Sequence, residues 1–490
     1  MILLDDDSSK LLPSTQPTLR FPEPAAGRSS LSLPDYETSQ AQQRPATHLR
    51  NPSKLPFPSH FDSRSRFWRA IFFALAIYVF LTVVIGIPLI VTKIILPKKQ
   101  APPNLQNLFL EDSDAAGPFL FGSDNMVMAA SSIQCDAWDS TGFSNGLFTA
   151  SVRRSLSPTG LFSVRSNATD EVLPRAGGSH NLTVAVNADA SETHVLMDLT
   201  LSASSLQLRK AAHFCFSPTG TNRGYSIYMP QNIPLSDYLA FDIRVLFPQS
   251  SQLLTPTDMI TYLPMFHQVI GPLSPHVRIA NINIAGAGVD IDCDNLQADK
   301  IAVKTSFAAI KGTFSVSQSL ALDNIEGPIY TNVTLVNDPT SGLATYIKAD
   351  TGNSDLNVNI TMASTSSGRT PHYNSNLRTF NGSLAVTMTH ENSTPPAVVQ
   401  LQVTNNQAPT KISLDSRFSG AYDLRSKLAA VRIKHPHMPS DWHVYTDTNS
   451  TSTVRGWAGW GMRPTDPNPS SDGKVTAVSS LSPIVLQLGT

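Results

Sequence analysis

The sequence predicts an all-β ectodomain behind one apolar helix and a polar N-terminal tail. Two patterns predict the β class. Apolar and polar residues alternate, as in LAFDIRVLF from Leu239, with the two-residue period of a half-buried strand. Apolar helical periods of ten or more residues are almost absent from the sequence, and DLRSKLAAVRI from Asp423 is the best of them. A β-solenoid is the favoured architecture, and a β-sandwich is the alternative.

Length and charge limit the kinds of protein that the chain can be. Its 490 residues leave room for two or three folded units. Only 15% of the residues are charged, and the formal net charge is −1. This balance gives no reason to expect nucleic acid as a partner, because nucleic-acid-binding proteins carry basic patches.

Residues 1–66 are expected to form a disordered cytosolic tail, since they are rich in proline and have no sustained apolar period. Two short motifs lie in this tail. Asp7, Leu11 and Leu12 match an acidic dileucine signal that clathrin adaptors read. Leu33, Pro34 and Tyr36 match a proline-tyrosine ligand of WW domains, which bind polyproline helices. Both patterns are short enough to occur by accident.

Residues 67–97 are expected to form a transmembrane signal anchor. The stretch from Ala70 to Thr92 holds 23 residues without a charge, and a bilayer core needs about 20. A cleaved signal peptide does not fit, because the apolar run is too long and a long polar segment precedes it. Basic residues are somewhat more frequent on the N-terminal side of the span, which favours a cytosolic N-terminus.

Acceptor sequences for N-glycosylation lie only after this span. They predict a type II single-pass membrane glycoprotein whose C-terminal part faces the secretory lumen and then the outside. The acceptor residues are Asn167, Asn181, Asn332, Asn359, Asn381, Asn392 and Asn449.

Three segments are expected after the membrane span: a stalk over residues 98–130, a β-rich domain over 131–275 and a β-solenoid over 276–490. The solenoid is predicted from two 19-residue segments that begin at Ile301 and Leu320. Each contains an Ile-x-Gly element, at 310–312 and 325–327, although these elements recur after only 15 residues. Meander strands of a sandwich at similar spacing are the alternative.

The three cysteines leave one unpaired in an oxidising lumen. Cys135 and Cys215 both lie in the first β region, so we expect them to form a disulfide. Cys293 is then either free and buried or bonded to another chain.

Acidic residues cluster at Asp290, Asp292 and Asp294, in the segment GVDIDCDNL. Two Asp-x-Asp pairs in a type II protein match the Mn²⁺ motif of Golgi glycosyltransferases, so a membrane-anchored luminal carbohydrate-active enzyme is the alternative function. Alternate carboxylates on one strand face could also bind Ca²⁺. The favoured interpretation is a solvated strand face. The sequence leaves open whether solvent, a bound ion or a lysine such as Lys300 or Lys304 from a neighbouring coil offsets the three negative charges.

Two further groups of residues are weaker candidates. His435, His437 and His443 could ligate a metal, but no recognised ligand spacing completes the group, and a proline-rich loop is the favoured interpretation. Trp457 and Trp460 could form an aromatic platform for sugars, although a place in the core is favoured.

The segment of about 276–365, which includes GVDIDCDNLQADKIAVKTS, resembles the adhesin-like repeat domains of unknown function found in bacteria and fungi. The segment GKVTAVSSLSPIVLQL from Gly473 resembles a terminal coil of the same kind. The whole layout is similar to uncharacterised single-pass proteins of filamentous and mushroom-forming fungi.

This resemblance implies a β-solenoid that faces the cell surface or wall, with no assigned catalytic residue. We therefore expect a structural, adhesive or ligand-binding protein of the cell surface or secretory pathway, without enzymatic activity. Its expected partners are the lipid bilayer and either a cell-wall glycan or another surface protein.

Overall fold

The computed structural model describes residues 134–168, 178–219, 222–230, 233–234, 236–250, 253–435, 440–465 and 472–489. They belong to one compact unit, residues 104–490. The described strands pair into one sheet of 27 strands, and one short helix, α5 (Leu206–Ala211), accompanies them. The prediction of an all-β fold is therefore confirmed for these residues. Within the described ranges, no helix is both long and apolar enough to cross a bilayer. The predicted tail, span and stalk lie outside these ranges.

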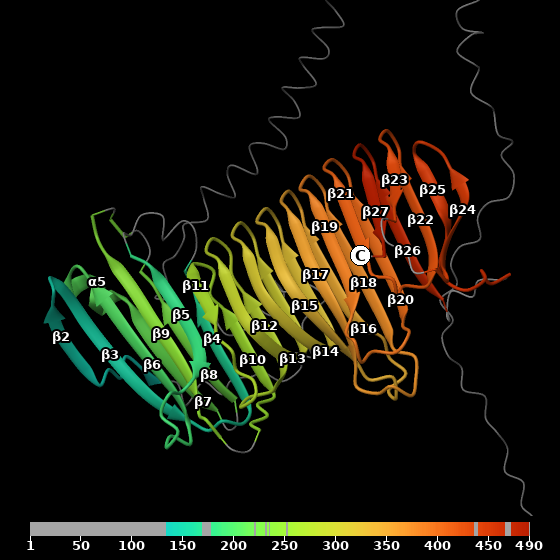
Figure 1. The fold of residues 1–490 in the computed structure, drawn as a ribbon. Coiled ribbons are helices and arrows are strands. Elements are labelled where there is room, and N and C mark those ends of the chain that lie inside the picture. Colours follow the sequence, from blue (N-terminus) through green and yellow to red (C-terminus); the bar gives the residue numbers. More distant parts are fainter. Residues whose placement is uncertain are drawn as a thin grey trace, which may run out of the picture. The chain divides into compact units, whose positions relative to one another are not determined.

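Most strands belong to two ladders of parallel strands, which Figure 1 shows as a continuous stack. Ladder 1 runs, in spatial order, through β8 (Asn222–Tyr228), β4 (Leu161–Ser166), β10 (Asp258–Tyr262), β12 (Ile279–Ala285), the second halves of β13 (Ile291–Thr305) and β14 (Ile310–Asn324), β16 (Thr345–Thr351), β18 (His372–Thr379), β20 (Val398–Asn405), β26 (Gly473–Ser479) and β22 (Gly420–Ser426).

Ladder 2 runs through β9 (Leu239–Phe247), β5 (His180–Val186), β11 (Phe266–Ile270), the first halves of β13 and β14, β15 (Ile329–Asn337), β17 (Leu356–Ser364), β19 (Leu384–His390), β21 (Thr410–Leu414), β27 (Ile484–Leu488) and β23 (Val431–Lys434). We use the word coil for one strand of ladder 1, the turn after it and the strand of ladder 2 that follows.

The core consists of apolar side chains that alternate along the strands and meet their counterparts from the next coil. In ladder 2, for example, Ile310, Ile329, Leu356 and Leu384 pair in register and are at most 1% exposed. Each such side chain contributes about 1.5–3 kcal/mol by leaving water, so the aligned rows are the main source of cohesion between coils.

A tight four-residue turn links the two ladders in each central and C-terminal coil, and a buried small polar residue precedes it. These residues are Thr305, Asn324, Thr351, Thr379, Asn405, Ser426 and Ser479. Most of them donate a hydrogen bond to a turn carbonyl of the neighbouring coil, as Thr351 Oγ1 does to the carbonyl oxygen of Gly327 at 3.0 Å. This staple satisfies a buried carbonyl and fixes the distance between coils.

The third position of these turns holds a small residue in each case, and at Gly327 and Gly382 the stacking of the turns leaves no room for a Cβ. A Cβ on Gly327 would lie 2.1 Å from the carbonyl oxygen of Ala308 in the preceding turn. The equivalent residues of the other turns are glycine, alanine or serine: Ala308, Ser354, Gly382, Ala408, Ala429 and Ser482.

The predicted 19-residue repeat is confirmed for one pair of residues, and the predicted equivalence of the Ile-x-Gly elements is wrong. Ile301 does pair with Leu320, 19 residues further on. The proposed equivalence of the two Ile-x-Gly elements is wrong, however, because Ile310 pairs with Ile329. Ile325 instead lies in a turn and is 61% exposed.

For two coils, the position in the stack differs from the order in the sequence. Strands β26 and β27, near the C-terminal end of the sequence, lie between the coil of β20 and β21 and the coil of β22 and β23. The segment expected to be a terminal coil is therefore an interior one. At the other end, β4 and β5 lie between β8 and β9 on one side and β10 and β11 on the other.

Antiparallel strands complete both ends of the stack. Strands β7 (His213–Thr219) and β1 (Gln134–Cys135) extend ladder 1 beyond β8, and β6 (Val195–Ala203), β3 (Leu147–Leu156) and β2 (Ser140–Ser144) extend ladder 2 beyond β9. Strands β25 (Thr453–Trp460) and β24 (Trp442–Asn449) extend ladder 1 beyond β22. The ladders run without interruption across the expected domain boundary near residue 275, since β10 pairs with β12.

Candidate functional site

The acidic segment lies on the outer side of ladder 2, on the turn before β13 and at the start of that strand. Asp290 accepts a hydrogen bond from Lys311 Nζ at 2.5 Å and another from the backbone N–H of Ala309 at 2.9 Å. Partial burial raises the pKa of Asp290, but the hydrogen bonds from Lys311 and Ala309 outweigh it, and the pKa is lower than usual. Of the alternatives that the sequence left open, the structure shows a lysine from a neighbouring coil at Asp290, and this lysine is Lys311.

The other two aspartates have different surroundings. Asp292 Oδ2 lies 2.7 Å from His267 Nε2, while Asp294 is exposed. A cation at Asp290 and Asp292 would have to displace Lys311 and His267 from these carboxylates. Among the described residues, no group of three or more histidine, cysteine, aspartate or glutamate side chains is placed to hold a metal ion together.

The predicted glycosylation sites are spread over the described strands and turns. Asn332, Asn359, Asn381, Asn392 and Asn449 are exposed, and Asn167 and Asn181 are half-buried. Asn167 is the most constrained of them: its side chain accepts a hydrogen bond from the N–H of Met229 and donates one to the carbonyl of the same residue. Asn332 and Asn359 face each other on adjacent strands, and Asn359 Nδ2 donates to Asn332 Oδ1 at 2.9 Å.

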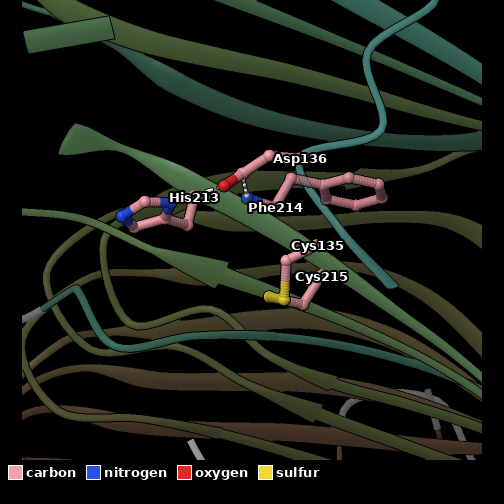
Figure 2. Close-up of a disulfide and its surroundings, with 5 residues drawn as sticks. All are labelled: Cys135, Asp136, His213, Phe214 and Cys215. Atoms are coloured by element: carbon pink, nitrogen blue, oxygen red, sulfur yellow. Dashed lines mark hydrogen bonds and ion pairs between the residues drawn. A yellow bond between two sulfur atoms is a disulfide. The ribbon is translucent and has the colours of Figure 1, made fainter. Parts of the chain in front are cut away.

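Cys135 and Cys215 are joined by a disulfide, which ties β1 to β7 where these residues pair. Figure 2 shows a second link beside it: the carboxylate of Asp136 accepts hydrogen bonds from the backbone N–H of Phe214 and from the ring of His213. The remaining cysteine, Cys293, is free and buried in the core, and burial raises the pKa of its thiol. Its neighbour in the next coil is Gly312, which has φ +148° and has no room for a Cβ beside Cys293.

The histidine and tryptophan candidates do not form a common site among the described residues. His443 is exposed on β24, His435 follows β23, and His437 lies outside the described residues. Trp457 is buried, as favoured, whereas Trp460 is 49% exposed and donates to the carbonyl oxygen of Ser416. The motifs at Asp7, Leu11 and Leu12 and at Leu33, Pro34 and Tyr36 also lie outside the described residues.

The most regular surface feature is a hydroxyl–amide array on the outer side of ladder 2. Four consecutive strands, β14, β15, β17 and β19, each place two uncharged polar side chains on this side. One row of the array consists of Thr313, Asn332, Asn359 and Thr387, and the other of Ser315, Thr334, Thr361 and Thr389. Strand geometry sets the rows ~7 Å apart and the members of a row ~4.8 Å apart.

The sequence analysis identified only Asn332 and Asn359 of this array, and it identified them as glycosylation acceptors. The signal is a polar-apolar-polar triplet that recurs in four consecutive coils: TFS from Thr313, NVT from Asn332, NIT from Asn359 and TMT from Thr387. The middle residues are buried in register, which fixes the outward direction of the flanking side chains.

No protein-family model matches the sequence, and no curated protein matches it either. A solved structure with some similarity is that of a "putative cell adhesion protein" from Clostridium sporogenes, which is 7% identical. The comparison covers 69% of this chain and 99% of that one, with a TM-score of 0.15. A TM-score this low does not indicate a shared fold.

Proposed function

We propose that the β part of this chain is a β-solenoid that presents ordered polar faces as a structural, adhesive or ligand-binding surface. The parallel register of corresponding strands supports a solenoid over a sandwich: Ile329 pairs with Leu356, and Leu356 with Leu384, always in the same direction. Sandwiches are built mainly from antiparallel strands.

The proposed setting is a single-pass type II membrane glycoprotein with its β part on the luminal or extracellular side. The uncharged run from Ala70 to Thr92 and the seven acceptor asparagines after it support this topology. The disulfide between Cys135 and Cys215 agrees with an oxidising compartment, where such bonds persist.

The observation that carries the proposed role is the hydroxyl–amide array, because it repeats one chemistry over four coils on the outer side of ladder 2, where its members are exposed or half-buried. The acidic segment offers less support for the alternative of a glycosyltransferase-like enzyme. Asp290 and Asp292 are each bonded to a basic side chain, Lys311 and His267, so they do not form an open pair of carboxylates.

The topology is tested by adding protease to sealed microsomes that contain the full chain with a tag at its N-terminus. We expect the tag to be digested and the β part to be protected until detergent is added. An endoglycosidase should increase the mobility of the protected fragment. A protected tag, or a fragment whose mobility does not change, would contradict the proposed topology. The variant Asn381→Gln/Asn392→Gln is a matched control for the size of the shift.

A further inference from the structure

The hydroxyl–amide array is rigid before any ligand arrives. Its members stand on strands whose inward residues Phe314, Val333, Ile360 and Met388 are at most 2% exposed. Threonine is branched at Cβ and has few rotamers, so these side chains lose little entropy when they bind. Such preorganisation favours binding, because the cost of ordering has already been met in folding.

The charge of the array differs from that of the outer side of ladder 1. All eight of its side chains are uncharged, whereas a row on the outer side of ladder 1 holds Lys304, Asp323, Asp350 and Arg378 in register across overlapping coils. Charge complementarity therefore favours an uncharged partner at the array and disfavours a polyanion or an acidic peptide.

The hydrogen-bonding chemistry of the array is equally specific. Every hydroxyl and every carboxamide can both donate and accept a hydrogen bond. A partner must therefore offer donors and acceptors in repetition along its length. Tyr330 stands on the same side of β15, two residues before Asn332, and is 42% exposed. Its ring adds an apolar surface with a polar tip beside the array.

We propose that the hydroxyl–amide array binds an uncharged polysaccharide. Sugar hydroxyls pair with the threonine and asparagine side chains, and the C–H face of a sugar ring packs on Tyr330. This inference rests on the proposed function, since it requires the β part to face the side of the membrane where such polymers occur.

Two members of the array, Asn332 and Asn359, are themselves acceptor asparagines, and a glycan on either would cover the surface. The proposed binding therefore requires both to be unmodified, and the topology is supported equally by the five other acceptors. The binding experiment therefore uses the full chain with Asn332→Gln and Asn359→Gln, which keeps the carboxamides and removes both acceptors. The detergent-solubilised protein is mixed with insoluble chitin, cellulose or β-1,3-glucan, and the bound fraction is measured. Polyanionic pectate serves as the comparison. We expect binding to at least one uncharged polymer and none to pectate.

The hydroxyls are then removed at positions that belong to no acceptor sequence. The variant Thr313→Val/Ser315→Ala/Thr387→Val/Thr389→Val should weaken binding by about ten-fold or more, since several hydrogen bonds are lost together. Two hydroxyls on ladder 1 provide the matched control, and Thr404→Val/Thr476→Val should bind normally. If the four-site variant does not fold, Thr387→Ser/Thr389→Ser, which retains the hydroxyls, should bind normally, and Tyr330→Ser should bind weakly.

Equal binding by the array variant and its parent would overturn the proposal, as would binding to pectate or to none of the uncharged polymers. The microsome experiment is independent of these results. A chain with the proposed topology that binds no polysaccharide would refute this inference alone, and a chain with another topology would refute the proposed function.

Discussion

At the scale of single residues, one buried hydroxyl holds two coils together. Thr351 is fully buried at the end of β16, and its Oγ1 donates to the carbonyl oxygen of Gly327 in the turn of the preceding coil. That carbonyl belongs to a turn that packs closely against the next one, since a Cβ on Gly352 would lie 2.4 Å from the carbonyl oxygen of Ile325. The hydroxyl therefore replaces hydrogen bonds to water that the stacked turn has lost.

Replacing Thr351 with valine tests this staple. The shape of the side chain is nearly preserved while the donor is lost, so we expect the free energy of unfolding to fall by about 1–3 kcal/mol. Chemical denaturation measures the change. The same substitution at Thr404, which lies on the outer side of β20, is the control and should change stability by less than about 0.5 kcal/mol. Equal effects at the two positions would contradict the role of the staple.

His180 makes stability depend on pH. Its ring is packed between Phe241 and Phe266, and its Nδ1 accepts a hydrogen bond from the backbone N–H of Phe241. Burial lowers the pKa of His180 from 6.5 to about 4. The unfolded chain therefore binds a proton between these values that the folded chain does not, and stability falls as the pH decreases from 6.5 to 4.

The full effect of this linkage is about 3 kcal/mol, since each unit of pKa difference corresponds to 1.36 kcal/mol. His180→Gln retains a hydrogen-bond acceptor but does not titrate. We expect the loss of stability between pH 7 and pH 4 to be smaller by about this amount in the variant, as measured by urea unfolding at both pH values. His194→Gln, at an exposed histidine, serves as the control. An unchanged difference in His180→Gln would show that His180 is protonated in the folded protein.

At the scale of secondary-structure elements, the sequence predicts the strands better than it predicts their partners. The alternation in Leu239–Phe247 is that of β9, with its odd-numbered residues buried. The number of residues per coil is harder to predict from the sequence, because only the tight turn between the ladders has a constant length. The corner opposite the tight turn varies from the short kink inside β14 to the loop over residues 338–344. The distance between equivalent residues therefore changes from 19 for Ile310 and Ile329 to 27 for Ile329 and Leu356.

Part of the candidate site could also be predicted from the alternation of residues along a strand. Alternation placed Asp290 and Asp292 on one outer face, and the structure agrees. Their partners could not be predicted, because the choice of Lys311 over Lys304 depends on which strand lies alongside, and register is a tertiary property. The hydroxyl–amide array was missed because a threonine on the polar face of one strand carries no signal until four strands are aligned.

The disulfide between β1 and β7 holds one element at the edge of the sheet. Strand β1 is two residues long and lies at the edge of the sheet, so the cross-link fastens a short element to the stack and not one coil to another. Replacing Cys135 and Cys215 with serine should open this edge locally, because local openings need only the free energy of the contacts that they break. We expect faster hydrogen exchange at the N–H of Phe214, which Asp136 covers, and unchanged exchange at Ile310. Uniformly faster exchange throughout both ladders would instead indicate a global loss of stability.

At the scale of the whole molecule, the C-terminal end of the stack is closed by strands that are not the last ones of the described sequence. Edge strands invite unwanted pairing. Ladder 2 ends at β23, which is four residues long and carries Arg432 and Lys434, and ladder 1 ends at the hairpin of β24 and β25. The coil of β22 and β23 that supports this end is separated from β20 and β21 by β26 and β27, so it can dock only after the chain has returned to fill the gap.

This order of assembly predicts an unusual response to truncation. A chain that stops after residue 465 lacks β26 and β27 and their fully buried residues Val475, Ala477, Ile484 and Leu486, but retains β22 to β25. In a simple stack of repeats, the longer of two truncated chains is the more stable, because each repeat adds an interface with its neighbour. Here we expect the chain 1–465 to be no more stable towards denaturant than the chain 1–414, because residues 415–465 have lost the coil on which they pack. Trp442, which is 2% exposed in the intact protein, reports the result in chains whose other four tryptophans are replaced by phenylalanine. Its fluorescence should shift towards that of an exposed indole in the chain 1–465, and protease should remove residues 415–465 while leaving the stack up to β21. A buried Trp442 in that chain would mean that β22 and β23 pair directly with β20 and β21, and that the inserted coil is dispensable.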